Sequence, residues 1–258
     1  MKVNIKEILW TNMYFFLRKN INHEKAKKQI MQGKKPMFAP TKEKQLNHWR
    51  NYEKIPGRKG TKRSIEIYLD KEINKGKSEA LLKKIYSINK DKTLPVLEIG
   101  CNAGRNLNYL FESGFSNLYG IEINPTAIKI LKEKFPELGL KTKFFIGALE
   151  DEIEKITDNQ IYLTFTMGVL QHIHPESNWV FKEISRITSN YIITFENESL
   201  YTIGGNFPRD YGKIFTELGW KLISTSTYVH NNLPVAVRVL KKENDVKPNN
   251  NADLSNNS

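Results

Sequence analysis

The chain has 258 residues, 40 Lys+Arg against 28 Asp+Glu, a formal net charge of +12 at pH 7 and a single cysteine, Cys101. This length can bury one sizeable core with room for an N-terminal addition. One cysteine has no disulfide partner in the chain, so the sequence excludes a disulfide-stapled scaffold of the secreted type.

The positive charge is concentrated in the first third of the chain. Residues 1–94 hold 24 Lys+Arg and 9 Asp+Glu, a net charge of +15, whereas residues 95–240 hold 13 and 16, a net charge of −3. This asymmetry predicts an anionic partner for the N-terminal region: RNA, an anionic membrane surface, or an anionic small-molecule acceptor. The alternative is a lysine-rich surface that only maintains solubility.

The N-terminal third reads as a basic, mostly helical extension. Residues 1–20 place apolar side chains on one helical face, which we expect to pack on the domain or a partner subunit, with a membrane surface as the alternative. Residues 25–40 read as a loop, and residues 81–88 as a helix that leads into the first strand. No secretory signal pattern and no run of about 18 apolar residues occur, so we expect a cytoplasmic protein, with peripheral membrane attachment as an alternative.

The segment 95–107 predicts a strand, a tight loop and the start of a helix. An apolar run ends in Glu98 and breaks at Gly100 and Gly104, where a ligand would approach the backbone or φ would be positive. Asn102 is the non-glycine type that best tolerates the left-handed region. The loop could hold a dinucleotide or another adenosine ligand. The spacing favours the second, because Arg105 takes the place of a third glycine and Glu98 would repel a pyrophosphate.

Strands and helices alternate through the rest of the chain. The second strand ends at Glu122, where a carboxylate can accept both hydroxyls of a ribose. This alternation predicts an α/β, doubly wound parallel sheet with ligands beyond the carboxyl ends of its strands. The further strands are expected at 142–146, 161–167, 191–195, 220–226 and 236–240.

On these motifs, residues 94 to 240 resemble class I S-adenosylmethionine-dependent methyltransferases. The first family motif matches Leu97-Glu-Ile-Gly-Cys-Asn-Ala-Gly104 and the second Gly120-Ile-Glu122. This second motif, the segment Gly168-Val-Leu-Gln-His-Ile-His-Pro175 and Glu196 are most similar to methylases associated with pseudaminic-acid biosynthesis. The resemblance implies a Rossmann-like sheet of seven strands with a C-terminal antiparallel hairpin. We expect an extension and cofactor lid at 1–93 and the methyltransferase domain at 94–242. Residues 243–258 have too little apolar content to fold and are expected to form a disordered tail.

The resemblance also implies a binding site for S-adenosyl-L-methionine. The loop from Gly100 to Gly104 would contact the methionine part, Glu122 the ribose, and Ala148 and Leu149 the adenine. The sequence departs from the family pattern at Ala148 and Tyr162, where many relatives carry acids, so Glu150 or a backbone group would accept from adenine. The full set of expected cofactor residues is Glu98, Gly100, Asn102, Gly104, Glu122, Ile123, Ala148, Leu149 and Met167.

Candidate catalytic bases lie beyond the fourth and fifth strands, where an acceptor would meet the methyl group. They are His172, His174 and Glu196. The plain alternatives are that His172 shapes the pocket, that His174 caps a helix, and that Glu196 contacts substrate only. No third ligand accompanies the two histidines, so no metal is expected. The expected substrate contacts are Trp49, Tyr52, Tyr201, Arg209 and Tyr211.

These observations predict methyl transfer to a small-molecule or sugar-type metabolite, such as a cell-surface glycan precursor. The first alternative is an RNA methyltransferase that uses the basic N-terminal region, although no RNA-binding module is recognised. The second is a non-catalytic cofactor-binding or scaffold protein, which the missing acids at Ala148 and Tyr162 would allow.

Overall fold

The structure, a computed structural model, describes residues 23–36, 39–54, 64–69, 71–199, 205–230 and 233–243. Three expectations lie outside these residues: the amphipathic helix within residues 1–20, the contact by Tyr201 and the tail beyond residue 243. No helix in the described ranges is long and apolar enough to cross a membrane.

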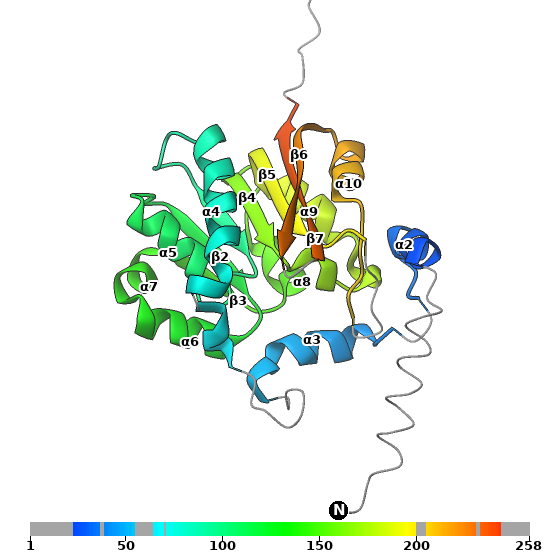
Figure 1. Cartoon of the computed structure of the whole chain (residues 1–258), viewed down its shortest axis with the longest axis horizontal. Helices are drawn as coiled ribbons and strands as arrows, with labels where there is room; N and C mark the ends of the chain where they lie inside the picture. The colour runs from blue at the N-terminus through cyan, green and yellow to red at the C-terminus, as the bar shows by residue number, and fades with distance from the viewer. Residues whose placement is uncertain are drawn as a thin grey trace, which may run out of the picture.

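Seven strands form one sheet in the order β3-β2-β1-β4-β5-β7-β6 (Figure 1). Strands β1 to β5 are parallel, and β7 is antiparallel to both of its neighbours. The expected Rossmann-like sheet with a C-terminal antiparallel hairpin is confirmed. The strands are β1 (Val96–Ile99), β2 (Leu118–Glu122), β3 (Lys143–Ile146), β4 (Ile161–Met167), β5 (Thr188–Glu196), β6 (Trp220–His230) and β7 (Leu233–Lys242).

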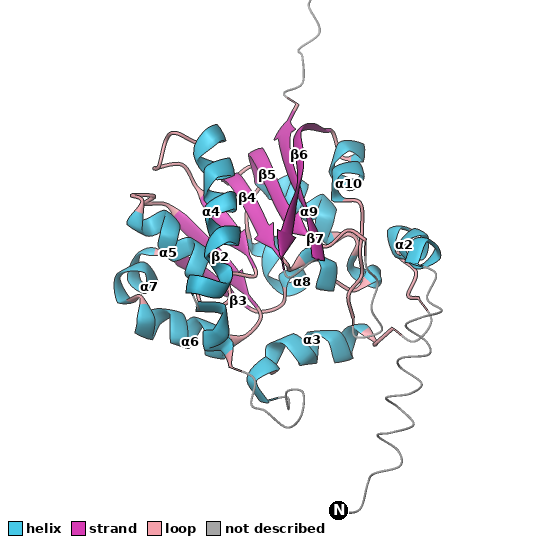
Figure 2. Cartoon of the chain, viewed as in Figure 1, coloured by secondary structure: helices cyan, strands magenta, loops and turns pink. Residues whose placement is uncertain are grey.

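Helices cover both faces of the sheet (Figure 2). One face packs against α4 (Lys71–Ile88), α5 (Arg105–Glu112), α6 (Pro125–Lys134) and α7 (Pro136–Lys141). The other packs against α8 (Leu149–Glu152), α9 (Val180–Ile187) and α10 (Tyr211–Glu217). In α9 the buried Val180, Ile184 and Ile187 follow the helical period, so one apolar stripe attaches the helix to the sheet.

Helix α4 belongs to this core rather than to a separate extension. Its Leu81, Leu82 and Ile85 are buried in the same cluster as Val96 of β1. The boundary expected at residue 93 therefore falls after a helix that the sheet requires for burial of one face. Before α4 lie two short 3-10 turns, η1 (Tyr52–Lys54) and η3 (Ile65–Leu69).

Two helices precede these turns, the first of them within a region that the sequence indicated as a loop. Residues expected as a loop from 25 contain α2 (His23–Met31), so that expectation was wrong in part. The surrounding lysines masked the pair Ala26 and Ile30, which pack with Ala39 and Phe207. Helix α3 (Lys42–Arg50) begins at Thr41, whose hydroxyl accepts from Lys44 N, and lies beside the carboxyl ends of the strands (Figure 1).

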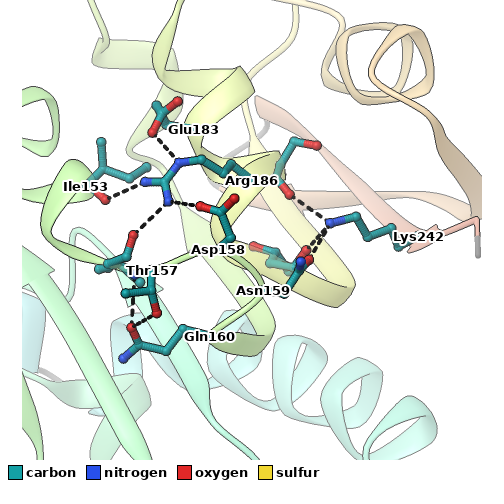
Figure 3. Close-up of polar contacts among 11 residues, drawn as sticks. Ile153, Thr157, Asp158, Asn159, Gln160, Glu183, Arg186 and Lys242 are labelled. Atoms are coloured by element: carbon teal, nitrogen blue, oxygen red, sulfur yellow. Dashed lines mark hydrogen bonds and ion pairs between the residues drawn. The ribbon is translucent and has the colours of Figure 1, made fainter.

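At the amino ends of β4 and β5, a polar network surrounds Arg186, which lies at the end of α9 (Figure 3). Its Nε donates to Glu183 Oε2 at 2.6 Å and its Nη1 to Asp158 Oδ1 at 2.6 Å. Lys242 Nζ donates to Asn159 Oδ1 at 2.8 Å and to Thr188 O at 2.8 Å. The network therefore ties the segment before β4 and the start of β5 to the end of β7, away from the carboxyl ends.

Candidate active site

A cavity of about 660 Å³ opens at the carboxyl ends of the parallel strands, with α3 over it. This volume is in the range of roughly 300–1,000 Å³ that holds cofactors and small molecules. Each parallel strand contributes to its wall at or just after its last residue. The contributors include Gly100 after β1, Glu122 of β2, Gly147 after β3, Met167 of β4 and Asn197 after β5.

The loop between β1 and α5 adopts the backbone that its residues predicted. Gly100 and Gly104 have φ of +72° and +81°, and Asn102 has φ of 49°. A Cβ at Gly100 would lie 2.3 Å from Val169 Cγ2, and one at Gly104 would lie 2.4 Å from Leu131 Cδ1. Glycine is thus required at both positions for conformation and for space.

Glu122 is buried at the tip of β2, and both of its carboxylate oxygens are positioned by backbone amides. Oε2 accepts from Asn102 N at 2.8 Å, and Oε1 accepts from Asn124 N at 2.8 Å. Burial raises the pKa of the Glu122 carboxyl, and these two amides oppose that rise. The carboxylate lines the cavity with acceptor capacity left on both oxygens, as a ribose diol requires.

Glu98 presents a buried carboxyl group of a different kind. Oε1 accepts from Asn106 Nδ2 at 2.7 Å, whereas Oε2 has no hydrogen-bond partner among the described residues. Burial raises the pKa of this group to about 8. A cationic ligand group in the cavity would supply the hydrogen-bond donor and the positive charge that Glu98 Oε2 lacks.

The end of the cavity at β3 places Leu149 and Glu150 in its wall, beside Ile123. Ala148 is buried immediately before α8 and is not a wall residue. Both carboxylate oxygens of Glu150 are buried without a hydrogen-bond partner in the described part of the chain. The acceptor that Ala148 cannot supply is therefore present two residues later.

His172 lies in the cavity wall under α3. Its Nδ1 is 3.3 Å from Gly205 O, which makes Nδ1 the protonated nitrogen, and its Nε2 is 3.2 Å from Gln171 Nε2. The Trp49 ring packs on the imidazole with a centroid distance of 4.4 Å. Burial lowers the pKa of His172 to about 4, so the ring is neutral at pH 7, with Nε2 as its unprotonated nitrogen.

The other two candidate bases have structural partners. His174 Nδ1 accepts from Glu176 N at 3.3 Å and caps η6 (Pro175–Ser177), although its ring also touches the cavity. Glu196 is not a wall residue: Oε1 accepts from Thr166 Oγ1 and Val169 N, and Oε2 accepts from Gln171 N. Its carboxylate thus positions the loop after β4, which carries His172.

Among the expected substrate contacts, some line the cavity and others are buried away from it. Trp49 is in the cavity wall, and its Nε1 is buried without a hydrogen-bond partner in the described structure. The Tyr52 ring stacks on the Trp49 ring, with a centroid distance of 5.6 Å and an interplanar angle of 7°. Arg209 is fully buried outside the cavity and donates to Asn178 Oδ1 and to the carbonyls of residues 170, 173 and 207. Tyr211 is buried in the core.

No sequence pattern pointed to several wall residues that the N-terminal helices contribute. Gln45 of α3 is buried, and its Nε2 donates to Gly205 O at 2.9 Å and His172 O at 3.2 Å. Lys77 of α4 also lines the cavity. Gln45 and Lys77 each lie in a helix that carries many other polar and basic residues. Only the tertiary packing therefore distinguishes them from residues on the surface. In the described ranges no group of three or more His, Cys, Asp or Glu could hold a metal ion.

A family model described as a methyltransferase domain matches residues 96–190. Over these residues the chain is similar to the methyltransferase family. This match and the shared fold support the methyltransferase class and the enzymatic activity that the sequence predicted. No curated protein sequence matches the chain significantly.

Solved structures of methyltransferases share the fold. Magnesium protoporphyrin IX methyltransferase from Synechocystis PCC 6803 is 14% identical with a TM-score of 0.59, over 78% of this chain and 97% of that chain. A methyltransferase from Leishmania major is 18% identical with a TM-score of 0.61, over 77% and 82%. Geranyl diphosphate C-methyltransferase from Streptomyces coelicolor is 10% identical with a TM-score of 0.60, over 81% and 100%.

Proposed function

We propose that this methyltransferase transfers a methyl group from S-adenosylmethionine to a polar small-molecule acceptor of the sugar type. The observation that carries the proposal is the continuity of one cavity. It runs from the carboxylates of Glu122 and Glu150 to a wall formed by Gln171, His172 and Asn197. One end fits an adenosine ligand, and the other presents amide and imidazole groups to a second molecule.

In the cofactor half, the residues present fit S-adenosylmethionine. Glu122 would accept the ribose hydroxyls, Glu150 the adenine amino group, and Glu98 would face the positive charge of the amino-acid part. The unpaired buried oxygens of Glu98 and Glu150 are satisfied by such a ligand, since buried acceptors without partners are costly. Gly100 and Asn102 of the loop after β1 line the cavity, so a ligand would meet the loop there.

The acceptor half assigns roles to Trp49 and His172. The Trp49 ring offers an apolar face and an unpaired N–H, a combination that suits a hydroxylated ring. When bound, the cofactor supplies a methyl group on a sulfonium. The bond between sulfur and the methyl carbon breaks during the transfer, and its electron pair stays on sulfur. His172 would accept the proton that the acceptor oxygen or nitrogen loses as its bond to the methyl carbon forms.

Known relatives of this fold act on chemically different acceptors, among them a porphyrin and geranyl diphosphate. The acceptor of this chain must therefore be inferred from its own wall residues. The amide-rich wall agrees with the sequence resemblance to methylases associated with pseudaminic-acid biosynthesis, so a glycan precursor is the proposed class. We further propose that α3 acts as a lid, because Gln45 and Trp49 reach the cavity from this helix.

Calorimetry with S-adenosylhomocysteine, followed by methyl transfer from labelled S-adenosylmethionine to a panel of amino sugars, nucleotide sugars and RNA, tests the proposal. We expect micromolar or tighter binding and transfer to a sugar-type compound. Transfer to RNA alone, with a steep salt dependence, would replace the acceptor class. Absence of cofactor binding would remove the proposal and favour the scaffold alternative.

A further inference from the structure

One cation in the cavity wall has no counterion. Lys77 lies in α4 and makes no hydrogen bond or ion pair with any residue in the described ranges. Other lysines of the same helix differ: Lys75 Nζ lies 3.9 Å from Glu79 Oε1, and Lys84 Nζ donates to Ser224 Oγ at 3.1 Å. Burial, followed by the nearby charge of Arg105, lowers the pKa of Lys77. An ammonium that is partly removed from water is thus left without compensation.

Arg105 provides a second positive charge beside Lys77. Its Nε donates to Ser78 Oγ at 2.9 Å, and its Nη1 donates to Tyr68 O. These partners are neutral and orient the guanidinium without cancelling its charge. The acid whose charge acts on Arg105 is Glu98, and burial raises the pKa of that carboxyl to about 8. Neither Lys77 nor Arg105 makes an ion pair with a residue in the described ranges.

We propose that Lys77, with Arg105 beside it, forms an oxyanion-binding subsite that takes a carboxylate or phosphate group of a bound ligand. A partly buried ammonium gains most from a charge-assisted hydrogen bond to such a group, whereas a neutral hydroxyl would leave its desolvation uncompensated. The inference rests on the proposed function for the identity of the ligands. Two sources share this chemistry: the amino-acid carboxylate of the cofactor and an acidic group of the acceptor.

The test compares wild type, Lys77→Met and Lys77→Arg by calorimetry with three probes. S-adenosylhomocysteine carries the carboxylate, 5′-methylthioadenosine lacks the amino-acid part, and inorganic phosphate is titrated into free and S-adenosylhomocysteine-saturated protein. Lys83→Met is the matched control, because Lys83 is exposed on the same helix. Circular dichroism of each variant verifies folding.

Either of two results supports the subsite. If it binds the cofactor carboxylate, Lys77→Met weakens S-adenosylhomocysteine binding by at least about tenfold, leaves 5′-methylthioadenosine unchanged, and Lys77→Arg recovers most of the loss. If it binds the acceptor, S-adenosylhomocysteine binding is unchanged and phosphate binding to the saturated wild type is lost in Lys77→Met.

If Lys77→Met bound all three probes as tightly as wild type does, the proposed subsite would be wrong. Equal losses in Lys77→Met and Lys83→Met would also overturn it, because they would report only the net charge of the helix. The proposed function fails separately, through absence of binding of both adenosine ligands to wild type. Phosphate titration of the free protein would still decide in that case whether Lys77 binds an oxyanion.

Discussion

Three buried glutamates line the part of the cavity that we assign to the cofactor, and they differ in their hydrogen-bond partners. Glu122 has two backbone donors, Glu98 has one side-chain donor, and Glu150 has none in the described structure. A carboxylate already oriented by amides can receive a ligand's hydroxyl groups without reorganisation. Glu122 is therefore the residue whose loss should have the most specific effect on cofactor binding.

We expect Glu122→Gln to weaken S-adenosylhomocysteine binding by at least about tenfold, because an amide offers a ribose diol one acceptor and no charge. Calorimetry measures the effect. Glu137→Gln, at an exposed carboxylate on α7, should bind as wild type does. An unchanged affinity in Glu122→Gln would remove the ribose assignment.

His172 is the candidate for proton transfer. His172→Asn keeps a donor near Gly205 O but removes the Nε2 acceptor, so we expect turnover to fall by about 100-fold or more with cofactor affinity retained. Turnover is measured with the acceptor found in the screen. Because the pKa of His172 is about 4, the wild-type rate should show no inflection from this residue between pH 6 and 8. Near-normal turnover in the variant would exclude His172 as the base.

At the scale of elements, loops and a lid helix assemble the cavity on a rigid sheet. Helix α3 is attached through Gln45 to Gly205 O and through its following turn to α6, where Glu53 accepts from Asn124 Nδ2 at 2.7 Å and Thr126 Oγ1 at 3.1 Å. Few contacts hold a short helix in this position, so local opening is expected to cost less than global unfolding.

We expect Gln45→Ala to increase amide hydrogen exchange in α3, because it removes two hydrogen bonds and leaves the carbonyls of Gly205 and His172 without this donor. Exchange mass spectrometry with and without S-adenosylhomocysteine measures the change. Glu43→Ala, at an exposed position of the same helix, serves as the control. Wild-type exchange in Gln45→Ala would show that other contacts hold the lid.

The network at the amino ends of β4 and β5 should affect stability alone. Arg186→Lys keeps the charge but not the planar fork that reaches Glu183, Asp158 and the carbonyls of residues 153 and 156. We expect a loss of about 1–2 kcal/mol in the free energy of unfolding, measured by urea denaturation. Cofactor affinity should not change, and Lys129→Ala, at an exposed ion pair, should cost less than about 0.5 kcal/mol. Weakened cofactor binding in Arg186→Lys would show coupling across the sheet.

For the whole molecule, the buried carboxyls make stability depend on pH. Burial raises the pKa of Glu98 to about 8 and that of Glu196 to about 7, from an ordinary value of 4.5. The folded protein therefore holds these protons at pH values where the unfolded chain has released them. The stability they contribute is complete below pH 4.5 and is lost as the pH rises through their folded values.

We accordingly expect the Tm of the ligand-free protein to fall between pH 7 and 8.5. Glu98 alone accounts for about 1 kcal/mol over this interval, or roughly 2–4 °C for a domain of this size. Thermal unfolding across the pH range measures it, and Glu98→Gln should flatten the profile whereas Glu137→Gln should not. A profile that stays equally steep in Glu98→Gln would mean that this carboxyl is ionised in the native state.

The sequence determined the sheet and the central loop, because both follow from local patterns. Apolar runs that end in Glu98 and Glu122 specify parallel strands, and Gly100, Asn102 and Gly104 specify a backbone that few other residues adopt. Long-range packing decided the remainder: that Glu150 rather than Ala148 faces the cavity, that Arg209 is a core residue, and that Glu196 positions a loop. The same packing brings Gln45 and Lys77 to the site across more than 90 residues of chain from His172. Such contacts depend on where whole elements lie, which hydrophobic burial over the entire chain decides and no short pattern encodes.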